Sequence, residues 1–252
     1  LMRIILSRTD SIGDVVLTLP MAGVLKEAFP CCSIIFLGTS YTRPVIESCR
    51  HVDEFVEWLQ IGNLPRNSES SPFASIAEPS SGNLEAALAT LHADVIIHVF
   101  PVREICKAAK KAGIRERIAT SHRMFTWLTC NRLVHLSRRR SDLHEAQLNL
   151  KLLQPLGIRR EFSRKEIPDY YGLQVETTKG WKVGGSDALK EGLFNLILHP
   201  KSKGSAREWG LENFGKLIEL IPADQFNILV TGTAAEGSSM KDFLQKYQNR
   251  IS

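Results

Sequence analysis

Short apolar segments alternate with helix-forming segments through the first half of the chain, and this alternation restricts the fold more than any other feature. Apolar runs at residues 3–7, 33–38 and 94–100 are predicted to be strands. Strands that alternate with helices in this way form a parallel sheet with helices on both faces. We therefore expect an α/β fold. Helices are expected at residues 14–28, 42–48, 84–91, 103–112 and 142–153, the last with Ser141 as N-cap, and shorter strands at 54–58 and 117–119.

A polar, poorly periodic stretch separates this region from a second strand–helix region. In that second region we expect strands at 194–198 and 225–231 and helices at 211–221 and 234–247. Two parallel strands cannot bury both of their faces, so we expect the second domain to be truncated. The expected parts are a Rossmann-like domain at residues 1–165 with a flexible Ser- and Pro-rich insertion at about 62–83, a connection at 166–190, and a partial second domain at 191–252.

The composition is that of a globular protein with excess positive charge. Of the 252 residues, 43% are hydrophobic and the formal net charge is +5, which favours a nucleic acid, a phosphorylated sugar or a membrane surface as partner. The five cysteines form no C-x-x-C pair, and an odd count with no signal peptide indicates a reducing cytoplasm. We expect Cys31 and Cys32 to be buried thiols. No apolar run approaches the ~18 residues of a membrane span, so a cytoplasmic location is expected.

The loop after the first expected strand carries the first candidate site. Residues 8–14 read R-T-D-S-I-G-D, with one glycine instead of the G-x-G-x-x-G of a dinucleotide-binding turn. Asp14 at the carboxyl end of a strand is positioned to act as a general base toward a substrate hydroxyl, and Gly13 lets a ligand approach the backbone. The alternative is that Asp14, with Asp10 and Ser11, only caps the helix and complements its dipole.

A basic loop at residues 199–209 is the second candidate site. Its cations, hydroxyls and backbone N–H groups precede a helix and suit a diphosphate, although the loop is not a Walker motif. The alternative is that the loop is only a solvated charged segment. Trp209 is expected to anchor the core. Gly232 and Glu236 follow the next strand, where a carboxylate can accept hydrogen bonds from ribose or merely complement the helix dipole. The loop's candidates are Lys201, Ser202, Lys203, Ser205 and Arg207.

Residues 123–140 interleave arginines with aromatic side chains. Arg123 and Arg138 flank this stretch, which suits a phosphorylated lipid or an anionic membrane surface. The alternative is a solvated surface whose aromatic side chains face the core.

Three segments in this order resemble motifs of the ADP-heptose:lipopolysaccharide heptosyltransferases of glycosyltransferase family nine. They are R-T-D-S-I-G-D-V-V-L-T-L-P at 8–20, L-H-P-K-S-K-G-S-A-R-E-W at 198–209 with E-N-F at 212–214, and T-G-T-A-A-E at 231–236. The resemblance extends over nearly the whole chain. It implies two Rossmann-like domains of the GT-B type and an inverting transfer of heptose from ADP-heptose to the lipopolysaccharide inner core, with no metal and no cofactor.

The resemblance also implies roles for single residues. Asp14 would deprotonate the acceptor hydroxyl, Arg207, Ser202 and Ser205 would hold the diphosphate, and Glu236 would hold the ribose. The complete donor-binding set is Lys201, Ser202, Lys203, Ser205, Arg207, Gly232 and Glu236, and the acceptor-binding set is Asp10, Ser11, Gly13, Arg123 and Arg138.

Two features depart from the family's pattern. Arg207 stands where many relatives carry lysine, and the family's last motif would follow about where this chain ends. The implied partners are a nucleotide-sugar donor, a Kdo-lipid A acceptor and, peripherally, the inner membrane.

Other functions remain open at this point. The same fold could use a different nucleotide sugar, and a chain with an incomplete donor site could be a non-catalytic binding module. A nicotinamide-dependent dehydrogenase is disfavoured by the missing glycine fingerprint, and no nucleic-acid-binding motif is recognised.

Overall fold

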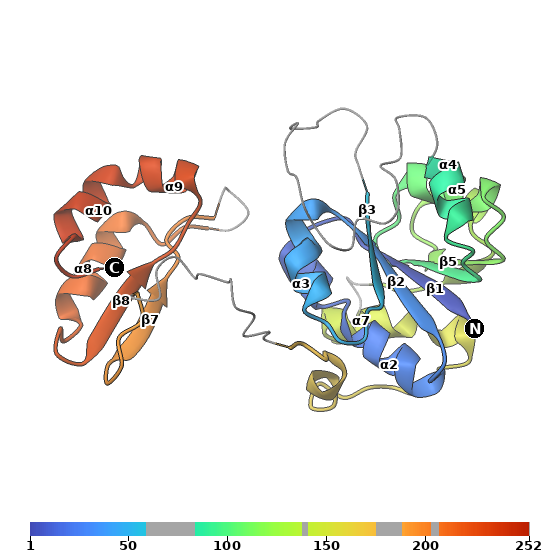
Figure 1. Ribbon diagram of the computed structural model, residues 1–252, viewed down its shortest axis with the longest axis horizontal. Helices are drawn as coiled ribbons and strands as arrows, with labels where there is room; N and C mark the ends of the chain where they lie inside the picture. Colours follow the sequence, from blue (N-terminus) through green and yellow to red (C-terminus); the bar gives the residue numbers. More distant parts are fainter. Residues whose placement is uncertain (59–83, 138–140, 175–187, 203–206, 252) are drawn as a thin grey trace. The chain divides into compact units, whose positions relative to one another are not determined.

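A computed structural model describes residues 1–58, 84–137, 141–174, 188–202 and 207–251 of the chain. The chain divides into two compact units, Leu1–Glu176 (unit 1) and Thr177–Ser252 (unit 2), and each is treated separately below (Figure 1). The expected insertion at 62–83 lies outside the described residues. Residues 166–174, expected in the connection, belong to unit 1.

Unit 1 is built around a parallel sheet of six strands in the order β3-β2-β1-β4-β5-β6. This is the strand order of a doubly wound Rossmann-type fold, in which the order reverses beside β1. The prediction of a parallel α/β sheet is therefore confirmed. The strands are β1 (Arg3–Ser7), β2 (Ser33–Gly38), β3 (Glu54–Glu57), β4 (Val95–His98), β5 (Glu116–Thr120) and β6 (Arg132–Val134).

Helices cover both faces of this sheet, as Figure 1 shows. Ile4 and Leu6 pack with the first group of helices, whereas Ile5 faces the second group. Strands buried on both faces carry continuous apolar runs, and this explains the sequence of β1, β2 and β4. The first group is α1 (Ile12–Val16), α2 (Pro20–Ala28), α3 (Arg43–Glu47) and α7 (Glu145–Lys151), and the second is α4 (Leu84–Thr90) and α5 (Arg103–Lys111).

The expected helix at 14–28 is two helices, α1 and α2. Pro20 is the first residue of α2 and has no N–H to donate to Val16, so one helix cannot run through it without a kink. The Thr18 hydroxyl donates to the carbonyl of Asp14 at 2.9 Å, and Asn149 of α7 donates to the carbonyl of Leu17 at 3.0 Å. The break therefore leaves α1 as a short helix that positions the loop after β1.

Three further expectations about unit 1 are corrected. The helix expected at 142–153 begins later, because His144 is its N-cap and forms a capping box with Gln147; Ser141 instead accepts from the N–H of Leu143. The basic stretch at 123–140 contains a helix, α6 (Met124–Thr129), and the edge strand β6, neither of which was expected. Cys32 is buried as expected, but Cys31 is exposed.

A short 3-10 helix, η4 (Ile167–Tyr170), packs on α2 and explains why residues 166–174 belong to unit 1. Gly23 of α2 allows this contact, because a Cβ there would meet the carbonyl oxygen of Tyr170. Ile167 is buried in the same core cluster.

Unit 2 contains two parallel strands, β7 (Phe194–Leu198) and β8 (Phe226–Val230), with the helices α8 (Leu211–Leu220), α9 (Ala234–Ser239) and α10 (Lys241–Tyr247). Its core includes Ile218, Ile228 and Phe243. Met240 ends α9, so the helix expected at 234–247 is two helices.

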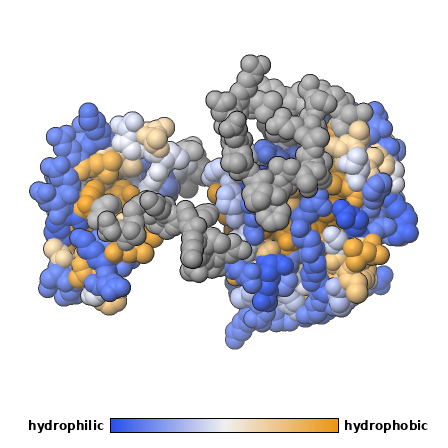
Figure 2. All heavy atoms as spheres, viewed as in Figure 1, coloured by the Kyte–Doolittle hydropathy of each residue, from blue (hydrophilic) through white to orange (hydrophobic). Residues whose placement is uncertain are grey.

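Large apolar side chains remain exposed on unit 2, and Figure 2 shows hydrophobic patches on the face of this unit that it displays. Phe194 is 72% exposed and Ile197 is 62% exposed. Trp209 is also exposed and contacts Phe214 edge-on with ring centroids 5.2 Å apart, so it does not anchor the core as expected. Among the described residues, no helix is long and apolar enough to cross a membrane.

Candidate active site

The loop after β1 lies where the strand order of unit 1 reverses. β1 pairs with β2 on one side and with β4 on the other, and all three strands are parallel. Their carboxyl ends therefore lie at one edge of the sheet, and ligands of doubly wound folds bind outside this edge at the reversal point. The predicted site loop is at that position.

The centre of the loop is the buried guanidinium of Arg8, whose side chain is 1% exposed. Its Nε donates to Oδ1 of Asp10 at 2.6 Å, and its Nη2 lies 2.7 Å from Oδ1 of Asp14. Its Nη1 lies 3.9 Å from Oε1 of Glu145, which comes from α7. One buried cation thus holds three carboxylates from two parts of the chain, leaving a formal excess of negative charge at this edge.

Asp14 lies in the first turn of α1, and both of its carboxylate oxygens are oriented by neighbours. Oδ1 pairs with Arg8, while the Ser11 hydroxyl donates to Oδ2 at 2.7 Å. Ser11 is also the N-cap of α1 and accepts from the N–H of Asp14 at 3.4 Å. The Asp14 side chain is 38% exposed. A carboxylate has about four lone-pair sites, so Asp14 can still accept a hydrogen bond from a ligand.

Gly13 is exposed, and a Cβ built on it would find only the Ser11 hydroxyl within 4.0 Å. The backbone beside Asp14 is therefore open to an approaching ligand. The structure thus brings Asp10, Ser11, Gly13 and Asp14 together, as the sequence predicted.

Arg123 reaches the same edge through an aromatic side chain. Its guanidinium carbon lies 5.2 Å from the ring centroid of Phe100, and the guanidinium carbon of Arg8 lies 5.9 Å from the same centroid. Phe100 follows β4 in the chain, so the ring connects the buried cation to the exposed one. Arg138, the other predicted acceptor residue, lies outside the described residues.

Sequence reasoning missed the organising role of Arg8 and the contribution of Glu145. An arginine after a strand is ordinarily expected to reach solvent. The available signal was two aspartates directly after a buried strand, since two carboxylates at a sheet edge need a cation beneath them. Glu145 offered no local signal, because it reaches the site only through the packing of α7.

The second candidate site lies at the carboxyl edge of β7 and β8 in unit 2. These strands pair in parallel, and Nδ1 of His199 lies 3.1 Å from the Thr231 hydroxyl. The expectation that the basic loop and the segment after β8 are neighbours is thereby confirmed.

A glutamate that the sequence analysis overlooked occupies the basic loop. Oε2 of Glu208 accepts from Lys201 at 3.1 Å, and Oε1 accepts from the N–H of Ser202 at 3.0 Å. These two contacts hold the pKa of the Glu208 carboxyl below its usual value, the Ser202 N–H having the larger effect. Glu208 thus occupies donors that the sequence analysis assigned to a diphosphate. Arg207 is exposed beside it, and Lys203 and Ser205 lie outside the described residues.

Glu236 is buried and forms a capping box at the start of α9. Its Oε2 accepts from the N–H of Thr233 at 2.7 Å and from the Thr233 hydroxyl at 2.8 Å. This geometry favours the structural interpretation of Glu236, whose carboxylate stabilises the turn that contains the exposed Gly232.

Among the described residues, three side chains of metal-ligating types lie close together: His98, Cys106 and Cys130. They are on the α5 face of the unit 1 sheet. Burial lowers the pKa of His98 to about 3. This group is separate from the Asp14 loop.

Comparisons with known proteins agree with this fold. No protein-family model matches the chain. A curated protein of Haemophilus influenzae named "Putative glycosyltransferase" is 25% identical over 247 residues, covering 96% of this chain and 66% of that protein. The chain thus spans about two thirds of the length of this relative.

Two solved structures share the fold at low sequence identity. A glycosyl transferase family 9 structure from Veillonella parvula has a TM-score of 0.73 and 17% identity, covering 97% of this chain and 66% of that one. The E. coli ADP-heptose lipopolysaccharide heptosyltransferase II has a TM-score of 0.72 and 15% identity, covering 100% of this chain and 71% of that one. The chain therefore has the α/β fold of glycosyltransferase family 9 structures.

Proposed function

We propose that this protein is an inverting glycosyltransferase that moves a heptose from ADP-heptose to the lipopolysaccharide inner core. The observation that carries the proposal is the Asp14 carboxylate, oriented by Arg8 and Ser11 at the reversal point of the sheet. The shared fold and the motifs around Asp14 and Arg207 support it. The E. coli heptosyltransferase WaaC, solved with ADP, also has this fold, with a TM-score of 0.63 at 14% identity, covering 100% of this chain and 73% of that one.

In the proposed reaction, Asp14 accepts the proton of the acceptor hydroxyl. The acceptor oxygen forms a bond to the anomeric carbon, and the bond from that carbon to the diphosphate oxygen breaks, so that ADP leaves with the bonding electrons. A single displacement of this kind inverts the anomeric configuration. Asp14 has the exposure and the spare lone pairs that a general base needs.

The proposed donor site is the carboxyl edge of β7 and β8. Lys201, Ser202 and Arg207 supply positive charge and N–H groups for the leaving diphosphate, which stabilise the charge that develops on it. This step needs neither a metal nor a cofactor. The proposed architecture is of the GT-B type, with one Rossmann-like domain for the acceptor and one for the nucleotide sugar.

The proposed acceptor surface includes α6. Its side chains Met124, Trp127 and Leu128 are 88%, 58% and 75% exposed, and Arg123 precedes them. Exposed apolar and basic side chains together suit a lipid-linked acceptor and a peripheral contact with the cytoplasmic face of the inner membrane.

The proposal is tested by a transfer assay with ADP-heptose and a heptose-deficient lipopolysaccharide acceptor, together with calorimetry of ADP binding. Asp14→Asn should lower the transfer rate by about 10²–10⁴-fold, because the general base is lost. The ADP dissociation constant should stay within a few-fold, since Asp14 belongs to the acceptor site.

Glu27→Gln serves as a control, because Glu27 is a carboxylate of unit 1 that pairs with Arg160 away from the loop. An Asp14→Asn variant that keeps the wild-type transfer rate would show that Asp14 only caps α1. If the chain binds ADP but transfers another sugar faster than heptose, the donor would be a different nucleotide sugar.

A further inference from the structure

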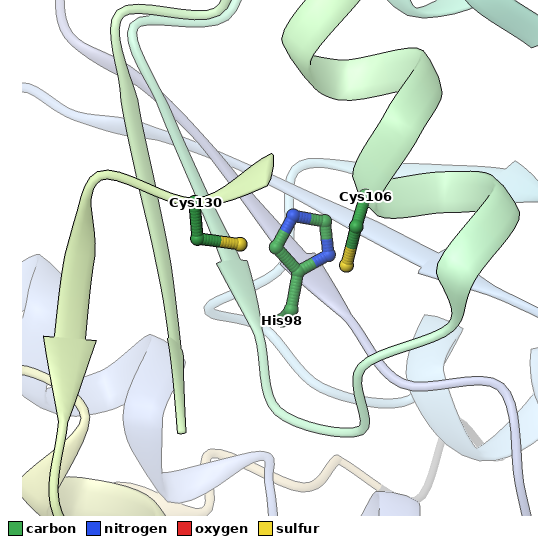
Figure 3. A group of neighbouring side chains, drawn as sticks. All are labelled: His98, Cys106 and Cys130. Atoms are coloured by element: carbon green, nitrogen blue, oxygen red, sulfur yellow. The ribbon is translucent and has the colours of Figure 1, made fainter. Parts of the chain in front are cut away.

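His98, Cys106 and Cys130 come from three separate segments of unit 1 and meet inside it. His98 is the last residue of β4, Cys106 lies in α5, and Cys130 follows α6. Their ligand atoms, one ring nitrogen and two sulfurs, all lie within 4.8 Å of one another. Figure 3 shows the imidazole ring lying between the two thiols, with both sulfurs directed toward it.

The imidazole of His98 lacks the hydrogen bonds that a buried ring normally makes. The residue is 0% exposed, and neither Nδ1 nor Nε2 has a hydrogen-bond partner among the described residues. Burying a polar group without a partner costs the desolvation of that group, so such groups are rare unless a ligand satisfies them.

The three side chains form a ligand set typical of zinc. Two thiolates and one imidazole bind Zn²⁺ in proteins, and thiolates select it over the hard cations magnesium and calcium. Two thiolates also balance the charge of Zn²⁺, so the complex is neutral and can be buried among Ala119, Phe125 and Leu133, which form the surrounding apolar cluster.

We propose that His98, Cys106 and Cys130 bind a structural Zn²⁺ ion within unit 1. The two thiols lose their protons to solvent as two Zn–S bonds and one Zn–N bond form, with no change in oxidation state.

The protonation state of His98 in the apo cluster is compatible with this reaction. Burial keeps the His98 imidazole neutral, the form that ligates a metal, with its pKa near 3.

The distances require only small side-chain movements. Zn–S bonds of about 2.3 Å and Zn–N bonds of about 2.0 Å place tetrahedral ligand atoms roughly 3.5–3.8 Å apart. The present separations are at most 4.8 Å, so each has to shorten by no more than about 1.3 Å. A fourth position is available to water or to the Thr129 hydroxyl, which lies 3.8 Å from the Cys130 sulfur. The ion would tie β4, α5 and the segment before β6 together.

The test uses Co²⁺ as a spectroscopic probe on the full chain, after removal of metals with a chelator. One equivalent of Co²⁺ should produce the visible bands of tetrahedral coordination and a thiolate charge-transfer band, and Zn²⁺ should displace it. Cys106→Ser and Cys130→Ser should each lower the Co²⁺ affinity by at least tenfold. Cys49→Ser is the matched control, because Cys49 is also buried but lies outside the cluster and donates to the carbonyl of Tyr171.

The wild-type zinc protein supplies a test that needs no variant. X-ray absorption should show two sulfur ligands at about 2.3 Å from zinc. Absence of tetrahedral Co²⁺ bands, a zinc shell of only nitrogen and oxygen ligands, or an unchanged affinity in both cluster variants would each overturn the proposal. Loss of Co²⁺ binding in Cys49→Ser alone would do the same.

Discussion

The two candidate sites, one in each unit, arrange their charges in opposite ways. In unit 1 a buried cation, Arg8, lies beneath three partly exposed carboxylates. In unit 2 a carboxylate, Glu208, accepts from two half-buried donors of the basic loop, the Lys201 ammonium and the N–H of Ser202. A buried charge is fixed by its partners and determines the local structure, whereas exposed pairs are screened by water and exchange readily. The first edge therefore has carboxylates held by a buried cation, whereas in the proposed function Glu208 at the second edge gives way to a phosphate.

The largest effect is expected when the buried cation is removed. Arg8→Met leaves Asp10, Asp14 and Glu145 without their common partner, and the free energy of unfolding should fall by about 3 kcal/mol. Urea denaturation of wild type and variant measures this loss. Arg8→Lys should lose less, because it keeps the charge but not the forked geometry. A variant as stable as wild type would mean that Arg8 does not organise this edge.

Acid should destabilise unit 1 through His98. Burial lowers the pKa of His98 from 6.5 to about 3, so below pH 6.5 the unfolded chain binds a proton that the folded chain does not. The contribution of His98 to the free energy of unfolding is therefore fully present above pH 6.5. Below pH 6.5 it decreases by about 1.4 kcal/mol per pH unit, which amounts to about 2 kcal/mol by pH 5. Chemical denaturation in excess chelator, compared with His98→Gln, isolates this contribution. Equal pH dependence in the two proteins would exclude it.

Each unit has a helical glycine that packs against a tyrosine, and substituting these glycines compares how closely the two units are packed. A Cβ at Gly23 would lie 3.0 Å from the carbonyl carbon of Tyr170, which is backbone and cannot move alone. A Cβ at Gly215 of α8 would meet the phenolic end of Tyr247, which is the far end of a side chain and not backbone. Gly23→Ala should therefore destabilise the protein by about 1–2 kcal/mol, and Gly215→Ala by less, as thermal unfolding can show. The reverse order would contradict the close contact of α2 with η4.

The smallest effect is expected at the exposed edge of unit 2. Glu208→Gln removes the carboxylate that competes for Lys201 and Ser202, so ADP should bind roughly twofold to fivefold more tightly in calorimetry. Glu212→Gln is a matched control, because its carboxylate pairs with Lys216 in α8. If Glu208→Gln binds ADP more weakly than the control, Glu208 supports the loop and does not compete with the phosphate.

Most of the parallel sheet of unit 1 was predictable from local patterns. β1 and β2 have the predicted bounds, because a strand buried on both faces leaves an unbroken apolar run. The breaks at Pro20 and Met240 and the edge strand β6 were not predicted. The helical periodicity of the sequence continues through Pro20 and Met240. β6 has only three residues, too few for a clear pattern.

The candidate site was predicted only in part. The Asp14 loop could be located because it follows an obvious strand. The contacts of Glu208 were missed, although this residue is near Lys201 in the chain, because the sequence does not show how a loop folds back on itself. The roles of Arg8 and Glu145 were missed because burial and helix packing decide them.

The sequence alone determined most of the order of strands and helices and the position of Asp14 in the segment after β1, since both depend on neighbouring residues. Only the tertiary structure decided that Arg8 is buried, that Glu145 reaches it from α7, and that His98, Cys106 and Cys130 meet. The physical reason is that burial and charge pairing depend on distances in space, and no local pattern encodes the distance between segments far apart in the chain.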